Sequence, residues 1–207
     1  MKNILKIGLF VCLSVLTTVS SNLSAAKRVL VEGSDYEVMT ASGTKTPEIM
    51  EFFNYGCPHC YTMEDFTNNF KKKHSDIKFI AVPTDLGHPQ WTIYVKAYYL
   101  GEILKVIDQS HGKIFQRIHV QNKAFTSDAD LKAFFATLGV DGALFDKANK
   151  SFTLNAKIRK AKQLARKFAI QGTPMFVANQ RFKLDNKKLG TTEMIEKAMV
   201  DLSQIIN

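Results

Sequence analysis

A sixteen-residue segment from Glu51 to Phe66, EFFNYGCPHCYTMEDF, places two cysteines two residues apart directly after an apolar run and a glycine. The run from Glu48 to Tyr55 is rich in aromatic and aliphatic residues and ends at Gly56, which is typical of a short buried strand. From Pro58 onward the apolar residues recur at helical spacing, and proline is well tolerated in the first turn of a helix. The segment therefore predicts a strand, a tight turn and a helix that begins with both thiols.

Further strands are predicted on either side of this motif. Ile77 to Pro83 resembles a second strand, so that strand, helix and strand follow within about 35 residues, as in a βαβ unit with parallel strands. Tyr36 to Met39 is a short strand candidate near the N-terminus. Near the other end, Met175 to Ala178 and Arg181 to Leu184 predict a hairpin around Asn179-Gln180, and Thr191 opens a closing helix.

The middle of the chain has a different character. From Trp91 to about Phe152 the pattern is helical, with Ser127 and Asp130 resembling a capping box, and no convincing strand is present. We therefore expect an α/β fold in which an all-helical domain, residues 89–155, is inserted into a domain built from residues 27–88 and 156–207. A further helix, Ala156 to Phe168, is strongly basic; we expect it to be a surface helix docked on the sheet, and we expect no nucleic-acid partner.

The first 26 residues have the features of a cleaved signal peptide. Lys2 and Lys6 precede an apolar stretch, Ile7 to Leu16, and Ser24-Ala25-Ala26 supplies small residues for cleavage. A retained N-terminal anchor is the alternative. Cys12, inside this stretch, is a poor lipoprotein acceptor and would be removed with it. Cleavage would lower the net charge from +9 to +7 and leave two cysteines in an exported protein, where disulfides persist.

The position of the two thiols predicts redox chemistry. Cys57 would cap the helix that begins at Pro58, where unpaired backbone N–H groups and the helix dipole favour a thiolate and lower its pKa. His59 adds a donor or a positive charge beside the sulfur, and Cys60, one turn along, is placed to close a disulfide with Cys57. A stabilised thiolate stabilises the reduced form, which makes the disulfide a stronger oxidant.

Other uses of the two cysteines compete with this one. A zinc site is disfavoured because the chain after residue 26 has no second cysteine pair and its histidines are scattered. A purely structural disulfide would close a very short ring and contribute little to stability. A chance pair of buried cysteines does not explain the strand, glycine, Cys-x-x-Cys and helix context. Redox exchange remains the best interpretation.

The motifs taken together resemble a known family. EFFNYGCPHC followed by a helix, then an all-helical block, then GTPMFV resembles the thioredoxin-fold oxidases of the DsbA family over residues 27–207, and Pro-His is the dipeptide associated with that family. The resemblance implies that Cys57 is the exposed nucleophile, that Cys60 is its buried partner and that His59 stabilises the Cys57 thiolate. It also implies that Pro174 is a cis-proline facing the disulfide.

Two positions qualify that resemblance. Thr173 precedes Pro174 where the best-known members carry valine, and related isomerases and reductases carry threonine there. Glu51 matches a buried acid that relays a proton to Cys60, although a strand-edge carboxylate in water is the alternative. The lysine that often accompanies this acid is not evident, because FIAVP is apolar at that point.

The resemblance implies a monomeric periplasmic oxidase without a bound cofactor. It would donate its disulfide to reduced, unfolded exported polypeptides through a shallow apolar contact, and a quinone-linked membrane protein of the DsbB type would reoxidise it. A disulfide isomerase or reductase on the same fold is the first rival, and Thr173 keeps it open. A peptide-binding chaperone with an incidental disulfide is the second, and a glutathione-dependent thioredoxin-fold enzyme the third, which the intact Cys-x-x-Cys disfavours.

Overall fold

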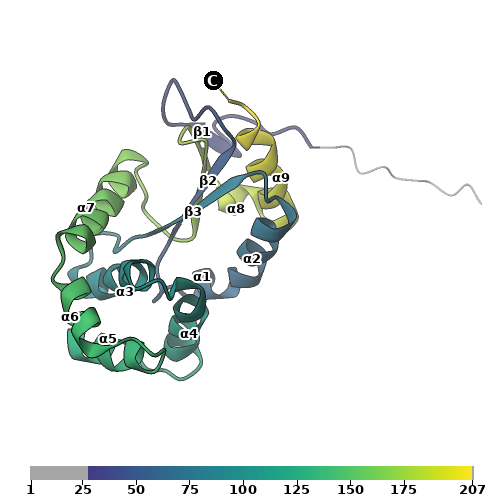
Figure 1. Ribbon diagram of the computed structural model, residues 1–207. Helices are drawn as coiled ribbons and strands as arrows, with labels where there is room; N and C mark the ends of the chain where they lie inside the picture. Colours follow the sequence, from purple (N-terminus) through teal and green to yellow (C-terminus); the bar gives the residue numbers. More distant parts are fainter. Residues whose placement is uncertain (1–27, 207) are drawn as a thin grey trace, which may run out of the picture.

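The computed structural model describes residues 28–206, so the predicted signal peptide, residues 1–26, lies outside the described residues. A five-stranded sheet runs through the molecule in the strand order β1-β5-β4-β2-β3 (Figure 1). Its strands are β1 (Tyr36–Val38), β2 (Glu48–Phe53), β3 (Lys78–Pro83), β4 (Met175–Ala178) and β5 (Phe182–Leu184).

The pairing of the strands confirms the predicted topology. β2 and β3 are parallel, as a βαβ unit requires, and β4 and β5 form the predicted antiparallel hairpin. β1 pairs with β5 and β2 pairs with β4, both antiparallel. The strand predicted from Glu48 to Tyr55 is too long by two residues. It ends at Phe53 because the Asn54 side chain bonds Thr84 O and Gly56 N, at 2.6 and 2.7 Å, and so starts the turn.

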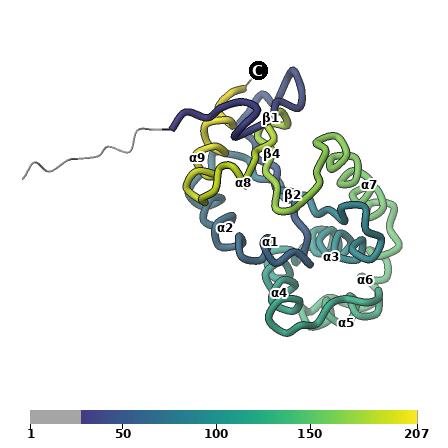
Figure 2. Tube along the Cα trace, turned by 180° about the vertical axis from the view of Figure 1, so that it is seen from behind, coloured from purple at the N-terminus to yellow at the C-terminus, as the bar shows by residue number. Residues whose placement is uncertain are grey.

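One face of the sheet is covered by α2 (Glu64–Lys73), α8 (Asn186–Leu189) and α9 (Thr192–Ser203), which lie on the right of the molecule in Figure 1 and on the left in Figure 2. Ile49 of β2 and Phe176 of β4 pack here with Phe70 of α2 and Met199 of α9. Successive side chains of a strand point to opposite faces, so Met50 and Val177 contribute to the other core. The short helix α1 (Pro58–Thr62) lies near the middle of both views, and its buried Cys60 belongs to that other core with Phe52 of β2.

The helix predicted from Pro58 onward is two helices. α1 and α2 are separated by Met63, whose φ and ψ are −90° and −1°. The hydroxyl of Thr62 donates to the carbonyl of His59, at 3.0 Å, and the N–H of Met63 donates to that same carbonyl at 3.1 Å. Side-chain competition for a helical carbonyl of this kind weakens the regular ladder. The chain therefore starts a new helix at Glu64.

The other core lies within a layer of helices beyond the ends of β2 and β3. These elements are the 3-10 turn η1 (Pro89–Trp91) and the helices α3 (Thr92–Ile103), α4 (Ile107–His119), α5 (Asp128–Ala136), α6 (Gly142–Asn149) and α7 (Phe152–Lys167). Ser127 caps α5 as predicted, but the Asp130 carboxylate bonds Thr126 N rather than Ser127 N.

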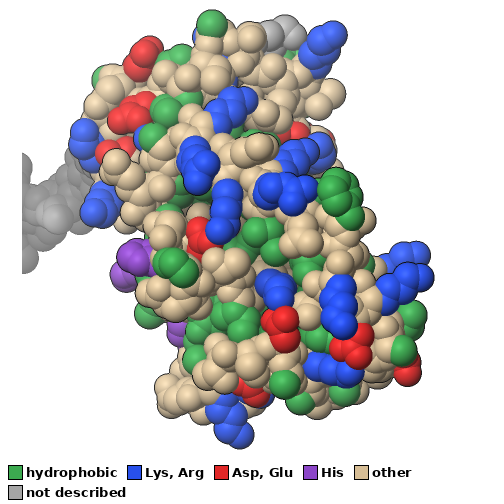
Figure 3. Space-filling view, turned by 90° about the vertical axis from the view of Figure 1, so that its left-hand side faces the viewer, with side chains coloured by type: hydrophobic (Ala, Val, Ile, Leu, Met, Phe, Trp, Pro, Cys, Tyr) green, Lys and Arg blue, Asp and Glu red, His purple; other side chains and the backbone are tan. Residues whose placement is uncertain are grey.

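The basic helix differs from its prediction in extent and in position. α7 begins at Phe152, four residues before Ala156, because Ser151 Oγ accepts a hydrogen bond from Leu154 N at 3.1 Å. The predicted boundary after residue 155 therefore falls inside this helix, and the division into two domains stays a prediction. α7 packs against α3 and α6 rather than lying flat on the sheet. Figure 3 looks onto this side of the molecule, where Lys and Arg side chains stand among hydrophobic ones.

Within residues 28–206 no helix combines the length and the apolar character that a membrane span requires.

Candidate active site

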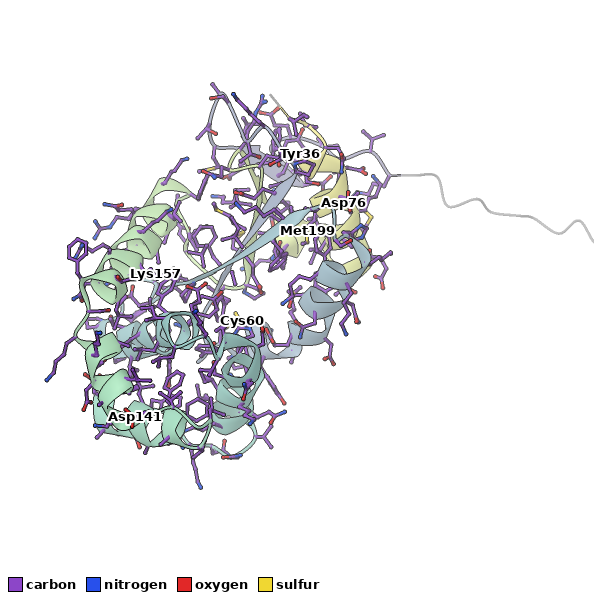
Figure 4. All side chains as sticks on the ribbon, viewed as in Figure 1. Tyr36, Cys60, Asp76, Asp141, Lys157 and Met199 are labelled. Atoms are coloured by element: carbon purple, nitrogen blue, oxygen red, sulfur yellow. The ribbon has the colours of Figure 1, made fainter. Side chains whose placement is uncertain are left out.

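Cys57 occupies the N-cap of α1, as the sequence predicts. Its backbone is extended, with φ −87° and ψ 116°, and its sulfur accepts a hydrogen bond from Cys60 N at 3.4 Å. Pro58 fills the first helical position, where no N–H is needed. Both cysteines are free thiols; Cys57 is half-buried and Cys60 is 1% exposed. Cys60 lies between the sheet and the helical layer, away from the outer ends of the molecule (Figure 4).

The two thiols differ strongly in acidity. The pKa of Cys57 is lowered from its ordinary 9.0 to about 5. A hydrogen bond from the Cys60 thiol is the largest cause, the Thr173 side chain and the backbone N–H groups of Cys60 and His59 add to it, and partial burial opposes it. The same bond, in which Cys60 is the donor, and then burial raise the pKa of Cys60 far above its ordinary value. One sulfur is therefore a ready thiolate and leaving group at neutral pH, and the other holds its proton.

The loop before β4 faces the nucleophile. The Thr173–Pro174 peptide bond is cis, and the Cys57 thiol donates to the carbonyl of Thr173 at 3.3 Å. The carbonyl of Pro174 accepts a hydrogen bond from Asn186 Nδ2 at 3.0 Å. The fold thus brings Thr173 and Pro174 to Cys57 from more than a hundred residues away in the chain.

His59 acts on the sulfur through its backbone. The His59 N–H is one of the groups that lower the pKa of Cys57, while the imidazole itself is exposed to solvent. The sequence predicts a donor or a charge from the side chain. In the structure the contribution of His59 is its backbone N–H in the first helical turn. Any residue except proline would supply the same N–H.

Glu51 is buried in the sheet rather than lying at a wet strand edge. It is 4% exposed in the middle of β2 and pairs in register with Ala81 of β3 and Phe176 of β4. The pKa of Glu51 is raised from 4.5 to about 8; burial is the largest cause, the charge of Glu64 adds to it, and the charge of Lys71 opposes it. Glu51 is therefore a carboxyl group that holds its proton at neutral pH and can release it near pH 8.

Several groups near this acid were missed from the sequence. Lys71 of α2 supplies a positive charge that lowers the pKa of Glu51, although the sequence shows no lysine for this role in the β3 segment. Glu64 and His111 are paired at 3.2 Å, and His111 also contacts the hydroxyl of Tyr55 at 2.7 Å. The sequence does place His111 eight residues before His119 in a helical segment, but this spacing does not identify the residues that His111 contacts.

A cavity of about 470 Å³ lies beside the cis-proline loop. Thr173, Pro174 and Met175 form one wall, and charged side chains contribute to the rest: Glu37, Lys183, Asp185 and Lys187. The lining of this cavity is mixed, and the predicted apolar contact with a client around Cys57 and the Thr173–Pro174 loop stays a prediction. Residues 28–206 contain no group of three or more His, Cys, Asp or Glu side chains arranged to hold a metal ion.

Known proteins are similar to this chain in sequence and in fold. Residues 97–195 match the model of the DSBA-like thioredoxin domain. The thiol:disulfide interchange protein DsbA of Pseudomonas syringae pv. tomato is 32% identical over 161 residues, which cover 77% of this chain and 73% of the relative. The crystal structure of Pseudomonas aeruginosa DsbA superposes with a TM-score of 0.77 at 27% identity and covers 84% of this chain and 93% of that one. Proteus mirabilis DsbA, solved with a non-covalently bound peptide, has a TM-score of 0.73 at 23% identity, over 86% of this chain and 100% of that one.

Proposed function

This chain belongs to the DsbA family of thiol:disulfide interchange proteins, and we propose that the disulfide it exchanges joins Cys57 to Cys60. The protein is a disulfide oxidoreductase with a thioredoxin-like fold. The observation that carries the proposal is the placement of Cys57 at a helix N-cap, where its pKa falls to about 5 while Cys60 stays protonated.

The proposed reaction begins with the oxidised protein. A thiolate of a client protein attacks the sulfur of Cys57, a mixed disulfide forms, and the Cys60 sulfur leaves and takes up a proton. A second client thiol, once deprotonated, then attacks the client sulfur of that bridge and expels Cys57 as a thiolate. The client gains a disulfide, and its two electrons remain on the reduced cysteine pair.

The direction of exchange follows from the two acidities. Cys57 is the stabilised leaving group, so the second step runs toward the client, and the reduced protein is favoured over the oxidised one. This supports an oxidase over a reductase or isomerase. The Thr173 side chain lowers the pKa of Cys57, so threonine before the cis-proline is compatible with a stabilised thiolate.

We assign the remaining site residues by their positions. Glu51 relays the proton that Cys60 gains and loses, since its pKa of about 8 allows both states near neutral pH. The loop of Thr173 and Pro174 positions the client segment against Cys57. The charged cavity beside it gives backbone and polar groups of the client places to bind. His59 stabilises the Cys57 thiolate through its backbone N–H at the exposed start of α1.

Reduced, unfolded exported proteins in the periplasm are the proposed clients. A DsbB-type quinone-linked membrane oxidase is the proposed source of new disulfides, because each round leaves the protein reduced. The protein would act as a monomer, with nothing but its own two sulfurs as the redox group.

The test is the equilibrium reduction potential of the purified protein in glutathione buffers, read by thiol trapping and by Trp91 fluorescence. We expect a potential well above the roughly −270 mV of thioredoxin, toward the roughly −120 mV of a strong oxidant. A value near that of thioredoxin would make the protein a reductase. The double variant Cys57→Ser with Cys60→Ser tests the chaperone alternative, because a peptide-binding module would keep its activity and a disulfide oxidase would lose it.

A further inference from the structure

The buried acid Glu51 lies on the face of the sheet that α2 covers. Its register partner in β3 is Ala81, and registered residues of neighbouring strands project to the same face. Ile49, two residues before Glu51 and therefore on the same face, packs with Phe70 of α2. Glu51 thus points toward the space between the sheet and α2, which offers a proton on it a route toward solvent.

A cavity of about 390 Å³ opens at this place. It is lined by Glu64 and Lys71 of α2, Ala81 of β3, Tyr98 of α3, and Asp108 and His111 of α4. Asp108 and Lys71 are exposed, so the cavity has contact with solvent at its outer end, while Ala81 marks its inner end beside Glu51. A cavity of this volume with this many polar groups has room for several water molecules.

His111 is held at the wall of this cavity by two polar contacts. Its Nε2 lies 3.2 Å from Glu64 Oε1 and its Nδ1 lies 2.7 Å from the hydroxyl of Tyr55. The rings of Phe53, Tyr98 and Phe115 pack around it at centroid distances of 5.3, 5.9 and 5.3 Å. The imidazole is therefore fixed in orientation, with one nitrogen toward the cavity carboxylate and the other toward a buried phenol.

The protonation state of Tyr55 determines which nitrogen of His111 carries a hydrogen. Burial raises the pKa of Tyr55 well above its ordinary value, so the phenol keeps its proton and donates to Nδ1. With Nδ1 as the acceptor, Nε2 carries a hydrogen and donates it to Glu64. The other charged groups that face the pair are Lys71 on α2 and Asp108 on α4, while Glu102 of α3 acts on Tyr55 from the far side.

We propose that Glu64 and His111 carry protons between solvent and the buried carboxyl of Glu51 in every redox cycle. This rests on the proposed role of Glu51 as the acid–base partner of Cys60. When the disulfide closes, the Cys60 thiol gives its proton to the Glu51 carboxylate, and the proton passes across the cavity to the Glu64–His111 pair and then to solvent. When the disulfide opens, the proton returns by the same route. No electrons pass through the pair; His111 and Glu64 only accept and release the proton, and neither touches the reacting sulfurs.

The test separates the two chemical steps of oxidation by oxidised glutathione. Cys57 first attacks the glutathione disulfide, and Cys60 then attacks the resulting bridge and releases glutathione. Acid quenching followed by alkylation resolves the mixed disulfide from the closed form. Only the second step requires Cys60 to lose its proton, so only that step depends on the route.

We expect His111→Gln and His111→Phe to leave the first step unchanged and to slow the second about tenfold, less than the full effect of a general base because Glu51 itself remains. The second-step rate should also lose part of its pH dependence. In His111→Ala the cavity opens to added imidazole, which should restore much of the rate. His119→Gln is the matched control: His119 lies on the same helix and bonds Tyr55 O at 2.8 Å, but it does not line this cavity.

Two outcomes overturn the proposal. Wild-type second-step rates in both His111→Gln and His111→Phe, with these variants shown to be folded by their urea unfolding midpoints, exclude a role for the histidine in proton transfer. If Glu51→Gln slows the second step while the His111 variants do not, the Glu51 relay stands and the route through His111 falls. If Glu51→Gln leaves the second step unchanged, the relay itself is wrong and the route falls with it.

Discussion

The amide nitrogen of Cys60 lies 3.4 Å from the sulfur of Cys57, so the nucleophile of the proposed reaction is also the cap of the helix that carries it. Helix caps are ordinarily oxygens of Ser, Thr, Asp or Asn, which accept N–H groups at any neutral pH. A thiol sulfur is a weak acceptor, whereas a thiolate carries a full charge. The cap at Cys57 is therefore complete only when the protein is reduced and the sulfur ionised, which couples the fold to the redox state.

The first prediction concerns the hydrogen bond between the two sulfurs. Cys60→Ala removes the donor that contributes most to the low pKa of Cys57, and we expect that pKa to rise by about 1–2, because a hydrogen bond to a charged group contributes about 1.5–3 kcal/mol. Ultraviolet absorbance of the thiolate during a pH titration measures it. Cys60→Ser is the control, since its hydroxyl still donates. Equal midpoints in the Ala and Ser variants would show that the Cys60 side chain is not the donor.

The local parts of this site were predictable from sequence because they depend on neighbours in the chain. Gly56, Pro58 and the spacing of Cys57 and Cys60 determine a turn and a helix start within a few residues. The hairpin at Asn179-Gln180 is likewise local, and both of these residues have positive φ, at 49° and 53°. Such features need no knowledge of the rest of the fold.

The parts that were missed depend on contacts between distant segments. Tyr55 and His111 are 56 residues apart, and His111 and Glu64 are 47 apart, so no spacing rule brings them together. The break at Met63 depends on a Thr62 hydroxyl that reaches the His59 carbonyl, a choice between rotamers that the sequence pattern does not contain. The short helix α8 was also missed, because Asp185 and Gly190 bound only four residues between them.

The second prediction follows from the charge on Cys57. The pKa of Cys57 is lowered to about 5 in the folded protein from an ordinary value of 9.0, so between these pH values the unfolded chain binds a proton that the folded one does not. The stability of the reduced protein should rise with pH across this window and fall as pH drops toward 5. The oxidised protein has no such group. The gap between the urea midpoints of the two redox forms should therefore widen from pH 5 to pH 9.

A matched variant isolates the cause of that gap. Cys57→Ser with Cys60 intact has no thiolate at the cap and forms no disulfide, so the gap between its urea midpoint and that of the oxidised wild type should stay constant from pH 5 to pH 9. Other titrating groups, Glu51 among them, are present in both redox forms and largely cancel in the comparison. A gap that stays constant from pH 5 to pH 9 would contradict a stabilised thiolate at Cys57.

The third prediction compares two glycines on neighbouring helices. A Cβ at Gly101 of α3 would lie 2.6 Å from Ser110 Oγ and 3.1 Å from Ile107 Cδ1, where α3 crosses α4. Ser110 is fully buried and short, so it has little freedom to move. Gly101→Ala should destabilise the protein by about 1–3 kcal/mol. A Cβ at Gly112 of α4 meets nothing within 4 Å, so Gly112→Ala should stabilise it by about 0.5–1 kcal/mol. Urea unfolding measures both changes in the free energy of unfolding. Equal changes in the two variants would contradict the close contact of Gly101 with Ser110 and Ile107.

The last prediction concerns the buried carboxyl of Glu51. Its folded pKa of about 8 lies above the ordinary 4.5, so the folded protein holds a proton that the unfolded chain releases between these pH values. The contribution of Glu51 to stability is therefore fully present below pH 4.5 and is lost as the pH rises through about 8. Glu51→Gln removes this loss, because the amide stays neutral. The variant should be more stable than the wild type by a few kcal/mol at pH 9, since a tenfold change in a proton-binding constant corresponds to about 1.4 kcal/mol.

Glu64→Gln provides the matched comparison for that measurement. The charge of Glu64 raises the pKa of Glu51, so removing it should move the loss of stability to lower pH without abolishing it. Urea unfolding of the oxidised proteins at pH 5, 7 and 9, where no Cys57 thiolate contributes, distinguishes the two variants, since only Glu51→Gln flattens the curve between pH 5 and 9. Parallel curves for wild type and Glu51→Gln would mean that the carboxyl is ionised in the folded protein. A Glu51 that is always ionised cannot donate a proton to Cys60. A different group would then have to exchange protons with Cys60.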